Sequence, residues 1–154
     1  MDPASHGRQH TVLIILKWRN IMTEQIHNSP SANEWLANAK SDACAQNIGM
    51  FLLHNGIVRA TSKATARYGK TDDRPVAGME VRCNRDLLEE IRKTTCAMKG
   101  IEVVKIWINE GTLRVGDDLM YVLIGGDIRP HVIGALEYLV GRIKSECIQE
   151  KELF

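Results

Sequence analysis

GGDIRPHVIGALEYLVGRIKSECIQEK, residues 125–151, is the stretch that decides the predicted fold of this chain. It follows an apolar run and enters an amphipathic segment through Pro130, a residue type well tolerated in the first turn of a helix. The apolar residues of the segment recur with helical spacing and are Ile133, Leu136, Leu139, Val140, Ile143 and Cys147. The pattern predicts a long helix. If that helix continues to Lys151, Lys144 and Lys151 share one face, because seven residues are close to two helical turns.

The segments upstream predict alternating strands and helices. Apolar or alternating runs predict strands near residues 48–54, 76–83, 101–108 and 119–124, with a short extended piece at 113–118. A helix is expected after Ser31, and a second one after Asn84, where each polar residue can cap the first turn. The order predicts an α+β fold, with a mixed or antiparallel sheet and helices packed on one face.

A basic segment follows the first predicted strand and contains Arg59, Lys63, Arg67 and Lys70. No acidic residue lies between Gly49 and Lys70, so this is the most basic part of the chain. Its remaining residues are mainly Ala, Thr, Ser and Gly, which predicts a mobile surface loop. The question is whether these cations, with those of residues 125–151, form a solvated surface or an anion site.

The overall composition argues against several functional classes. The chain has 154 residues, 44% hydrophobic and 25% charged, which is ordinary for a soluble globular domain. A net charge of +1 gives no general attraction to nucleic acid or to an anionic membrane, and 5% aromatic residues disfavour a base-stacking surface. Any anion binding must therefore come from local clustering of cations.

The cysteines and the N-terminus indicate a cytoplasmic protein. Cys44, Cys83, Cys96 and Cys147 are scattered without metal-ligand spacing, which predicts reduced thiols, no bound metal and no cofactor. The apolar run 11–16 is too short for a signal sequence or a membrane helix. We expect residues 1–30 to be an extension or flexible N-terminal arm, of which 1–21 lie upstream of a more usual start at Met22, and residues 31–154 to form one domain.

The order and spacing of several segments resemble the large, catalytic subunit of molybdopterin synthase. The resemblance runs from about residue 48 to residue 151. It is carried by Gly49–Arg59, by Val76–Val81, by the signature Gly111–Asp117, by Arg129 after the last long strand, by Lys144 in the helix, and by Lys151-Glu152 at the family's spacing from Lys144. The chain therefore looks like a member of that family, with the family's α/β-hammerhead fold.

The same alignment shows departures from the family pattern. Ile128 stands where the family has a histidine before Arg129, and Ile108-Asn109 replaces an earlier His-Arg pair. Residues 148–150, Ile-Gln-Glu, replace the family's Pro-x-Trp. The family's tail, which can contribute to the pocket of a neighbouring subunit, is absent because the sequence ends at Phe154. The resemblance is to a shortened, divergent member.

The resemblance implies an activity and a set of partners. The family transfers sulfur from the thiocarboxylated C-terminus of a ubiquitin-like small subunit to cyclic pyranopterin monophosphate, and so makes the dithiolene of molybdopterin. The resemblance assigns Lys144 and Lys151 to catalysis, and Arg59 and Arg129 to substrate binding. Cations suit a phosphate or a carboxylate, and a lysine can act as an acid, a base or a nucleophile. A large-subunit dimer within a heterotetramer is expected.

Other interpretations of the same residues remain open at this stage. The chain could be a non-catalytic paralogue that binds a ubiquitin-like small subunit, or an unrelated nucleotide- or RNA-binding α+β domain that uses the basic segment 59–70. Lys63, Arg67 and Lys70 are interpreted as exposed loop charges, with a substrate role as the less favoured alternative. Trp107 is interpreted as a core residue, and His54 as a polar residue at a strand end.

Overall fold

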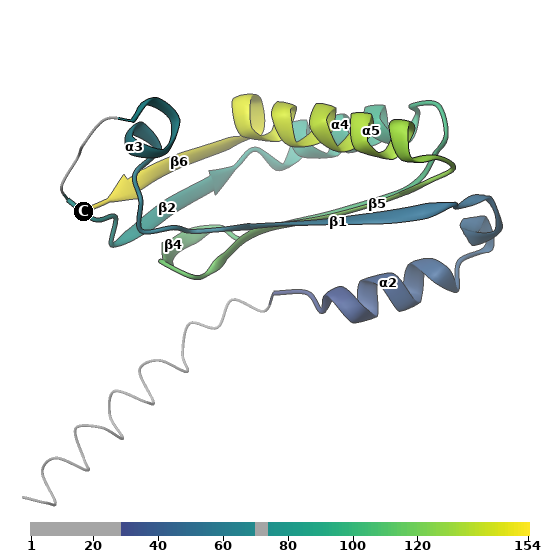
Figure 1. Cartoon of the computed structure of the whole chain (residues 1–154), viewed down its shortest axis with the longest axis horizontal. Helices are drawn as coiled ribbons and strands as arrows, with labels where there is room; N and C mark the ends of the chain where they lie inside the picture. The colour runs from purple at the N-terminus through teal and green to yellow at the C-terminus, as the bar shows by residue number, and fades with distance from the viewer. Residues whose placement is uncertain (1–28, 70–73) are drawn as a thin grey trace, which may run out of the picture.

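A computed structural model describes residues 29–69 and 74–154 and shows a first antiparallel sheet of three strands (Figure 1). Its order is β1 (Met50–Ile57), β5 (Asp118–Gly126) and β3 (Ile101–Ile108), with β5 in the centre. Leu53 of β1 pairs with Leu123 of β5. The central strand is buried along most of its length because it is covered on both faces, which explains its nearly continuous apolar sequence.

A second sheet of three strands is also antiparallel and has the order β4-β2-β6. β2 (Gly78–Cys83) lies between β4 (Gly111–Arg114) and β6 (Ile148–Leu153). The register pairs Glu80 with Lys151 and Val81 with Glu150. The last six residues before the C-terminal Phe154 therefore form a strand and lie beside a segment about seventy positions earlier in the chain.

Two helices cover one face of the first sheet, in agreement with the predicted fold class (Figure 1). They are α4 (Arg85–Cys96), whose first turn is capped by the Asn84 side chain, and α5 (Arg129–Arg142). Their apolar stripes meet the inward side chains of β5, and Ile91, Met120, Val122 and Leu139 are almost completely buried. Each such side chain contributes about 1.5–3 kcal/mol through removal of apolar surface from water.

A further helix, α2 (Ala32–Lys40), lies on the opposite side of the first sheet (Figure 1). Ser31 caps it as the sequence predicts, and a 3-10 turn, η2 (Ala43–Asn47), leads on to β1. The ring of Trp35 meets Tyr121 edge-on, and Tyr121 also meets Trp107 at 5.9 Å between ring centroids. Trp107 is half-buried and belongs to this aromatic cluster, outside the buried core between the first sheet and helices α4 and α5.

The long helix predicted after Pro130 does not continue to Lys151, which was the condition for Lys144 and Lys151 to share a face. α5 ends at Arg142, a π-helical turn, η3, follows over Ile143–Cys147, and residues 148–153 form β6. Ile143 and Cys147 continue the apolar stripe and are buried, but beyond them the backbone pairs with β2. The tertiary hydrogen bonds of the sheet override the local helical pattern, so Lys144 and Lys151 do not share a helix face.

The basic segment also differs from its prediction as a mobile loop. Residues Lys63–Tyr68 form a short helix, α3, which begins after Ser62 and ends at Gly69, whose φ of 63° is in the left-handed region. Lys70 and residues 71–73 lie outside the described part of the chain, as does the predicted arm up to residue 28. Within the described ranges, the helices are too short or too polar to cross a bilayer.

Candidate functional site

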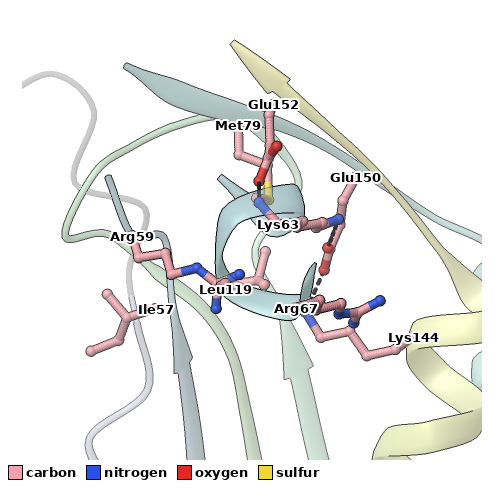
Figure 2. A pocket seen from close by; sticks show the side chains of 10 residues that line it. Ile57, Arg59, Lys63, Arg67, Met79, Leu119, Lys144, Glu150 and Glu152 are labelled. Atoms are coloured by element: carbon pink, nitrogen blue, oxygen red, sulfur yellow. Dashed lines mark hydrogen bonds and ion pairs between the residues drawn. The ribbon is translucent and has the colours of Figure 1, made fainter. Parts of the chain in front are cut away.

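A pocket of about 270 Å³ gathers side chains from both sheets and from α3 (Figure 2). Arg59 reaches it from the segment after β1, Lys63 and Arg67 from α3, and Lys144 from η3. Its apolar wall is formed by Ile57, Ala66, Met79 and Leu119, and its acidic residues are Glu150 and Glu152 of β6. Four cationic and two acidic side chains give the pocket a formal excess of two positive charges.

Glu150 lies between two of the lysines that line the pocket (Figure 2). Its Oε2 pairs with the ammonium group of Lys63, and its Oε1 accepts a hydrogen bond from the ammonium group of Lys144. The Glu150 side chain is only 6% exposed, whereas those of Lys63 and Lys144 are 36% and 33% exposed. One buried carboxylate therefore bridges a lysine of α3 and the lysine that follows α5.

The charge state of Glu150 follows from these contacts. Burial is the strongest single influence and raises its pKa, but the hydrogen bonds and charges of Lys144 and Lys63 together outweigh it. The net pKa lies below the ordinary value of 4.5. Glu150 is consequently ionised at neutral pH, as a bridging carboxylate between two ammonium groups should be.

Glu152 fixes α3 against the second sheet. Its Oε1 accepts a hydrogen bond of 2.7 Å from the backbone N–H of Lys63, at the first turn of α3. Ser62, which is buried, accepts another from the N–H of Thr65 and caps the same turn. Since Glu150 and Glu152 are two residues apart on one strand, their side chains project to the same face and hold α3 at two points.

The two arginines of the pocket have fewer partners. Arg59 donates from its Nε to the carbonyl oxygen of Thr61 at 2.9 Å, which leaves the rest of its guanidinium directed into the pocket (Figure 2). Neither Arg59 nor Arg67 forms an ion pair with any carboxylate of residues 29–69 and 74–154. Guanidinium groups that are not paired with a carboxylate are suited to bidentate contacts with phosphate or carboxylate.

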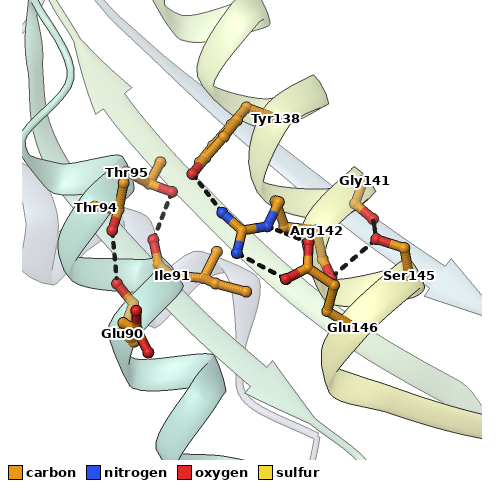
Figure 3. A network of polar contacts seen from close by, with 9 residues as sticks. All are labelled: Glu90, Ile91, Thr94, Thr95, Tyr138, Gly141, Arg142, Ser145 and Glu146. Carbon is orange, nitrogen blue, oxygen red and sulfur yellow. Dashed lines mark hydrogen bonds and ion pairs between the residues drawn. The ribbon is translucent and has the colours of Figure 1, made fainter.

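A polar network spans the junction between α5 and the π-helical turn η3 (Figure 3), and η3 is the turn that contains Lys144. Arg142 donates to the hydroxyl of Tyr138 at 2.8 Å and to Oε2 of Glu146 at 2.7 Å. The hydrogen bond with Glu146 is the main reason that the pKa of Arg142 is raised and that of Glu146 is lowered. Ser145 donates to the carbonyl oxygen of Gly141 at 2.9 Å. These contacts bracket the π-helical turn and fix the position of Lys144.

Two of the four predicted site residues lie together, and two lie elsewhere. Arg59 and Lys144 line the same pocket. Lys151 is exposed in a separate shallow depression, which is also lined by Glu80, Arg82, Gln149 and Glu150. Arg129 is the exposed first residue of α5, and about 20 Å of helix separates it from Lys144.

His54 lies near the pocket without lining it. It sits within β1, not at its end, and borders an apolar groove with Leu136 and Val140. Burial, followed by the positive charge of Lys144, lowers its pKa. The imidazole is therefore neutral at pH 7 and adds no charge to the pocket.

The sequence interpretation missed half of the pocket. Lys63 and Arg67 were assigned to a loop, although Ser62 before an alanine-rich turn is a recognisable helix start. The sequence interpretation includes Glu150 in the stretch that a continued helix would cover, and it gives neither Glu150 nor Glu152 a role in the site, because a helical pattern does not reveal the alternation of these residues with Gln149 and Lys151. A strand interpretation of residues 148–153 places both carboxylates on one face and exposes the pattern.

Comparisons with known proteins agree with this fold. The chain matches the family model described as MoaE protein over residues 26–146. A comparison with individual curated proteins gives no significant match. Among solved structures, molybdopterin synthase from Staphylococcus aureus is 19% identical, with a TM-score of 0.62 over 82% of this chain and 87% of that chain.

Two further structures are similar to the same extent. A molybdopterin biosynthesis MoaE protein from Burkholderia ambifaria MC40-6 is 22% identical, with a TM-score of 0.62 over 82% of this chain and 79% of that one. A complex of subunits 1 and 2 of the molybdopterin-converting factor from Helicobacter pylori 26695 is 22% identical, with a TM-score of 0.58 over 82% and 80%. At these identities the likeness establishes the fold, while the family match spans most of the sequence. The chain therefore belongs to the MoaE protein family of molybdenum cofactor biosynthesis.

Proposed function

We propose that this chain is the catalytic subunit of a molybdopterin synthase. In this role it transfers sulfur from the thiocarboxylated C-terminus of a ubiquitin-like small subunit to cyclic pyranopterin monophosphate. The observation that supports the proposal most strongly is the shared pocket of Arg59 and Lys144, two residues that the family resemblance singles out and that lie 85 positions apart in the sequence. We further propose that the protein acts in the cytoplasm as a dimer within a heterotetramer.

The residues of the pocket suit the chemical tasks of this reaction. The enzyme must hold a phosphate, admit the end of an extended tail, and move protons while carbon–oxygen bonds become carbon–sulfur bonds. Arg59, Arg67 and Lys63 supply cationic groups for the phosphate or the terminal carboxylate. Lys144 serves as the central catalytic lysine, which donates a proton to oxygen or, when deprotonated, attacks the thiocarboxylate carbonyl.

Lys151 and Arg129 keep their proposed roles only in a larger assembly. Neither lines the pocket of Lys144 within one chain. A catalytic role for Lys151 requires a substrate that extends across β6, and a substrate role for Arg129 requires a site completed at the start of α5 by another subunit. We propose both roles for the assembled enzyme and not for the isolated chain.

Reconstitution tests the proposal directly. Purified protein, a thiocarboxylated small subunit and cyclic pyranopterin monophosphate should yield molybdopterin, and Lys144→Ala should abolish the product while the fold is preserved. Lys40→Ala, on exposed α2, is a matched control and should retain full turnover. Near-normal turnover of Lys144→Ala would refute the assignment of the catalytic lysine.

A second candidate function is that of a non-catalytic paralogue that binds the small subunit. The ion pair between Glu150 and Lys144 favours it, because an ammonium group paired with a carboxylate is not a nucleophile. Isothermal titration with the small subunit separates the two functions. A complex that forms with wild-type protein but gives no product under the reconstitution conditions supports the paralogue and contradicts the enzyme.

A further inference from the structure

The position of the Glu150 carboxylate indicates how the pocket binds an anionic ligand. Both oxygens of the Glu150 carboxylate are engaged by lysines on opposite walls, Lys63 on α3 and Lys144 after α5. Two ammonium groups that converge on one compact oxyanion are the arrangement that a phosphate or a terminal carboxylate would itself require. The carboxylate thus stands where an external anion would be bound.

We propose that Glu150 is an intramolecular anion that occupies the cationic pocket, and that a small oxyanion ligand binds by displacing its carboxylate from Lys63 and Lys144. The inference rests on the proposed function in one respect, which is that this pocket is the site where the anion binds. Arg59 and Arg67 have no carboxylate partner among the described residues, so they remain available to make the first contact with the incoming anion. Glu150 then acts as a specificity-determining residue, because only ligands that satisfy both lysines better than one carboxylate does are retained.

The structure also indicates what makes the exchange possible. Lys63 and Lys144 are each about one-third exposed, so solvent and a ligand reach the ammonium groups although Glu150 itself is buried. Glu152 and Ser62 both bond to the backbone of the first turn of α3, so two of the contacts that hold this helix do not involve Glu150. Release of the Glu150 side chain therefore leaves α3, and with it Lys63 and Arg67, in place.

Calorimetric titration with two probes tests the proposal at low, constant ionic strength. Inorganic phosphate represents a phosphate group, and N-acetylglycylglycine represents a peptide carboxylate. Glu150→Gln keeps the size of the side chain and removes its charge, and it should bind at least one probe about tenfold more tightly than wild type. The probe that gains affinity identifies which source of the oxyanion the pocket prefers.

A charge-matched control and a measurement on the wild type complete the experiment. Glu80→Gln removes one carboxylate on the outer face of β2, where Glu80 pairs with Arg82, and should leave both affinities unchanged. In wild-type protein, saturating phosphate should shift the carboxyl ¹³C resonance of Glu150 as its lysine contacts are lost, which requires no variant to fold.

Several results would overturn the proposal. They are equal affinities of wild type and Glu150→Gln for both probes, weaker binding by Glu150→Gln, an equal gain in Glu80→Gln, or a Glu150 resonance that does not respond to phosphate. Because no sulfur donor is present, this outcome is independent of the reconstitution assay. Failure of sulfur transfer with displacement intact would refute the proposed function alone.

Discussion

The carboxylate of Glu150 couples the stability of this protein to pH at the scale of a single residue. It is buried between Lys63 and Lys144, and its pKa is lowered because their hydrogen bonds and charges outweigh the effect of burial. A depressed carboxyl pKa stabilises the folded state fully above the ordinary value of 4.5. That stabilisation is lost as the pH falls through the folded-state pKa of Glu150.

Glu150→Gln should therefore change how stability depends on pH. Between about pH 6 and about pH 3 the wild type should lose more of its free energy of unfolding than the variant, since only the wild type must protonate this buried group. At neutral pH the variant should be less stable by about 1–3 kcal/mol, because charged hydrogen bonds are weakened. Urea unfolding at the two pH values measures both effects. If the free energy of unfolding depends on pH in the same way in both proteins, the contacts of Glu150 with Lys63 and Lys144 are contradicted.

At the scale of elements, the pocket depends on the docking of α3. This helix has only six residues and cannot be stable alone, because nucleation of an isolated helix is unfavourable. It is held by the Ser62 cap, by the hydrogen bond from the N–H of Lys63 to Glu152, and by the ion pair of Lys63 with Glu150. Two of these three contacts come from β6.

Glu152→Ala should loosen α3 and leave the two sheets intact. We expect amide hydrogen exchange in residues 63–68 to accelerate about fivefold, since a lost contact at the helix start is worth about 1 kcal/mol. Exchange in β5 should not change. Hydrogen exchange with mass spectrometry follows both segments, and Glu80→Ala is the control for loss of an acidic side chain from the sheet. Unchanged exchange in α3 would show that Glu152 does not hold it.

The same elements show how far the sequence predicts the structure. The strand at residues 101–108 and the helix after Asn84 were predicted with nearly their observed bounds, since hydrophobic period and capping agree there. Residues 148–153 were not, because Ile143 and Cys147 continue a helical stripe and only pairing with β2 turns the chain into a strand. Only part of the pocket is predicted from the sequence, because its two acidic residues lie in this unpredicted strand. Arg59 and Lys144 came from resemblance, whereas Glu150 and Glu152 depend on that pairing.

At the scale of the whole molecule, a nearly neutral protein contains a locally cationic pocket. The chain has a net charge of +1, while the side chains of the pocket alone have an excess of two positive charges. The remaining residues of the chain therefore have a formal net charge of −1, which gives no general attraction to long anions. Because the chain belongs to the MoaE family, it is not an unrelated nucleic-acid-binding domain.

We accordingly predict selective binding of small anions over polyanions. Fluorescence anisotropy with a labelled single-stranded RNA at physiological salt should show no saturable binding, because affinity for nucleic acid requires many phosphate contacts. A basic protein of similar size is the positive control for the RNA. Affinity that persists at high salt would contradict this prediction and would restore the basic segment 59–69 as a nucleic-acid surface.

The pairing of β6 with β2 determines the net charge of the pocket, because alternate residues of a strand point to opposite faces of the sheet. Even-numbered Glu150 and Glu152 line the pocket, whereas odd-numbered Gln149 and Lys151 do not, although Glu150 also borders the depression that contains Lys151. One residue inserted within the π-helical turn would exchange the two sets and change the pocket from an excess of two to an excess of five positive charges. A single-codon insertion or deletion near residues 143–147 would thus remove both carboxylates from the pocket and leave its cations without them. No residue that lines the pocket would need to be substituted.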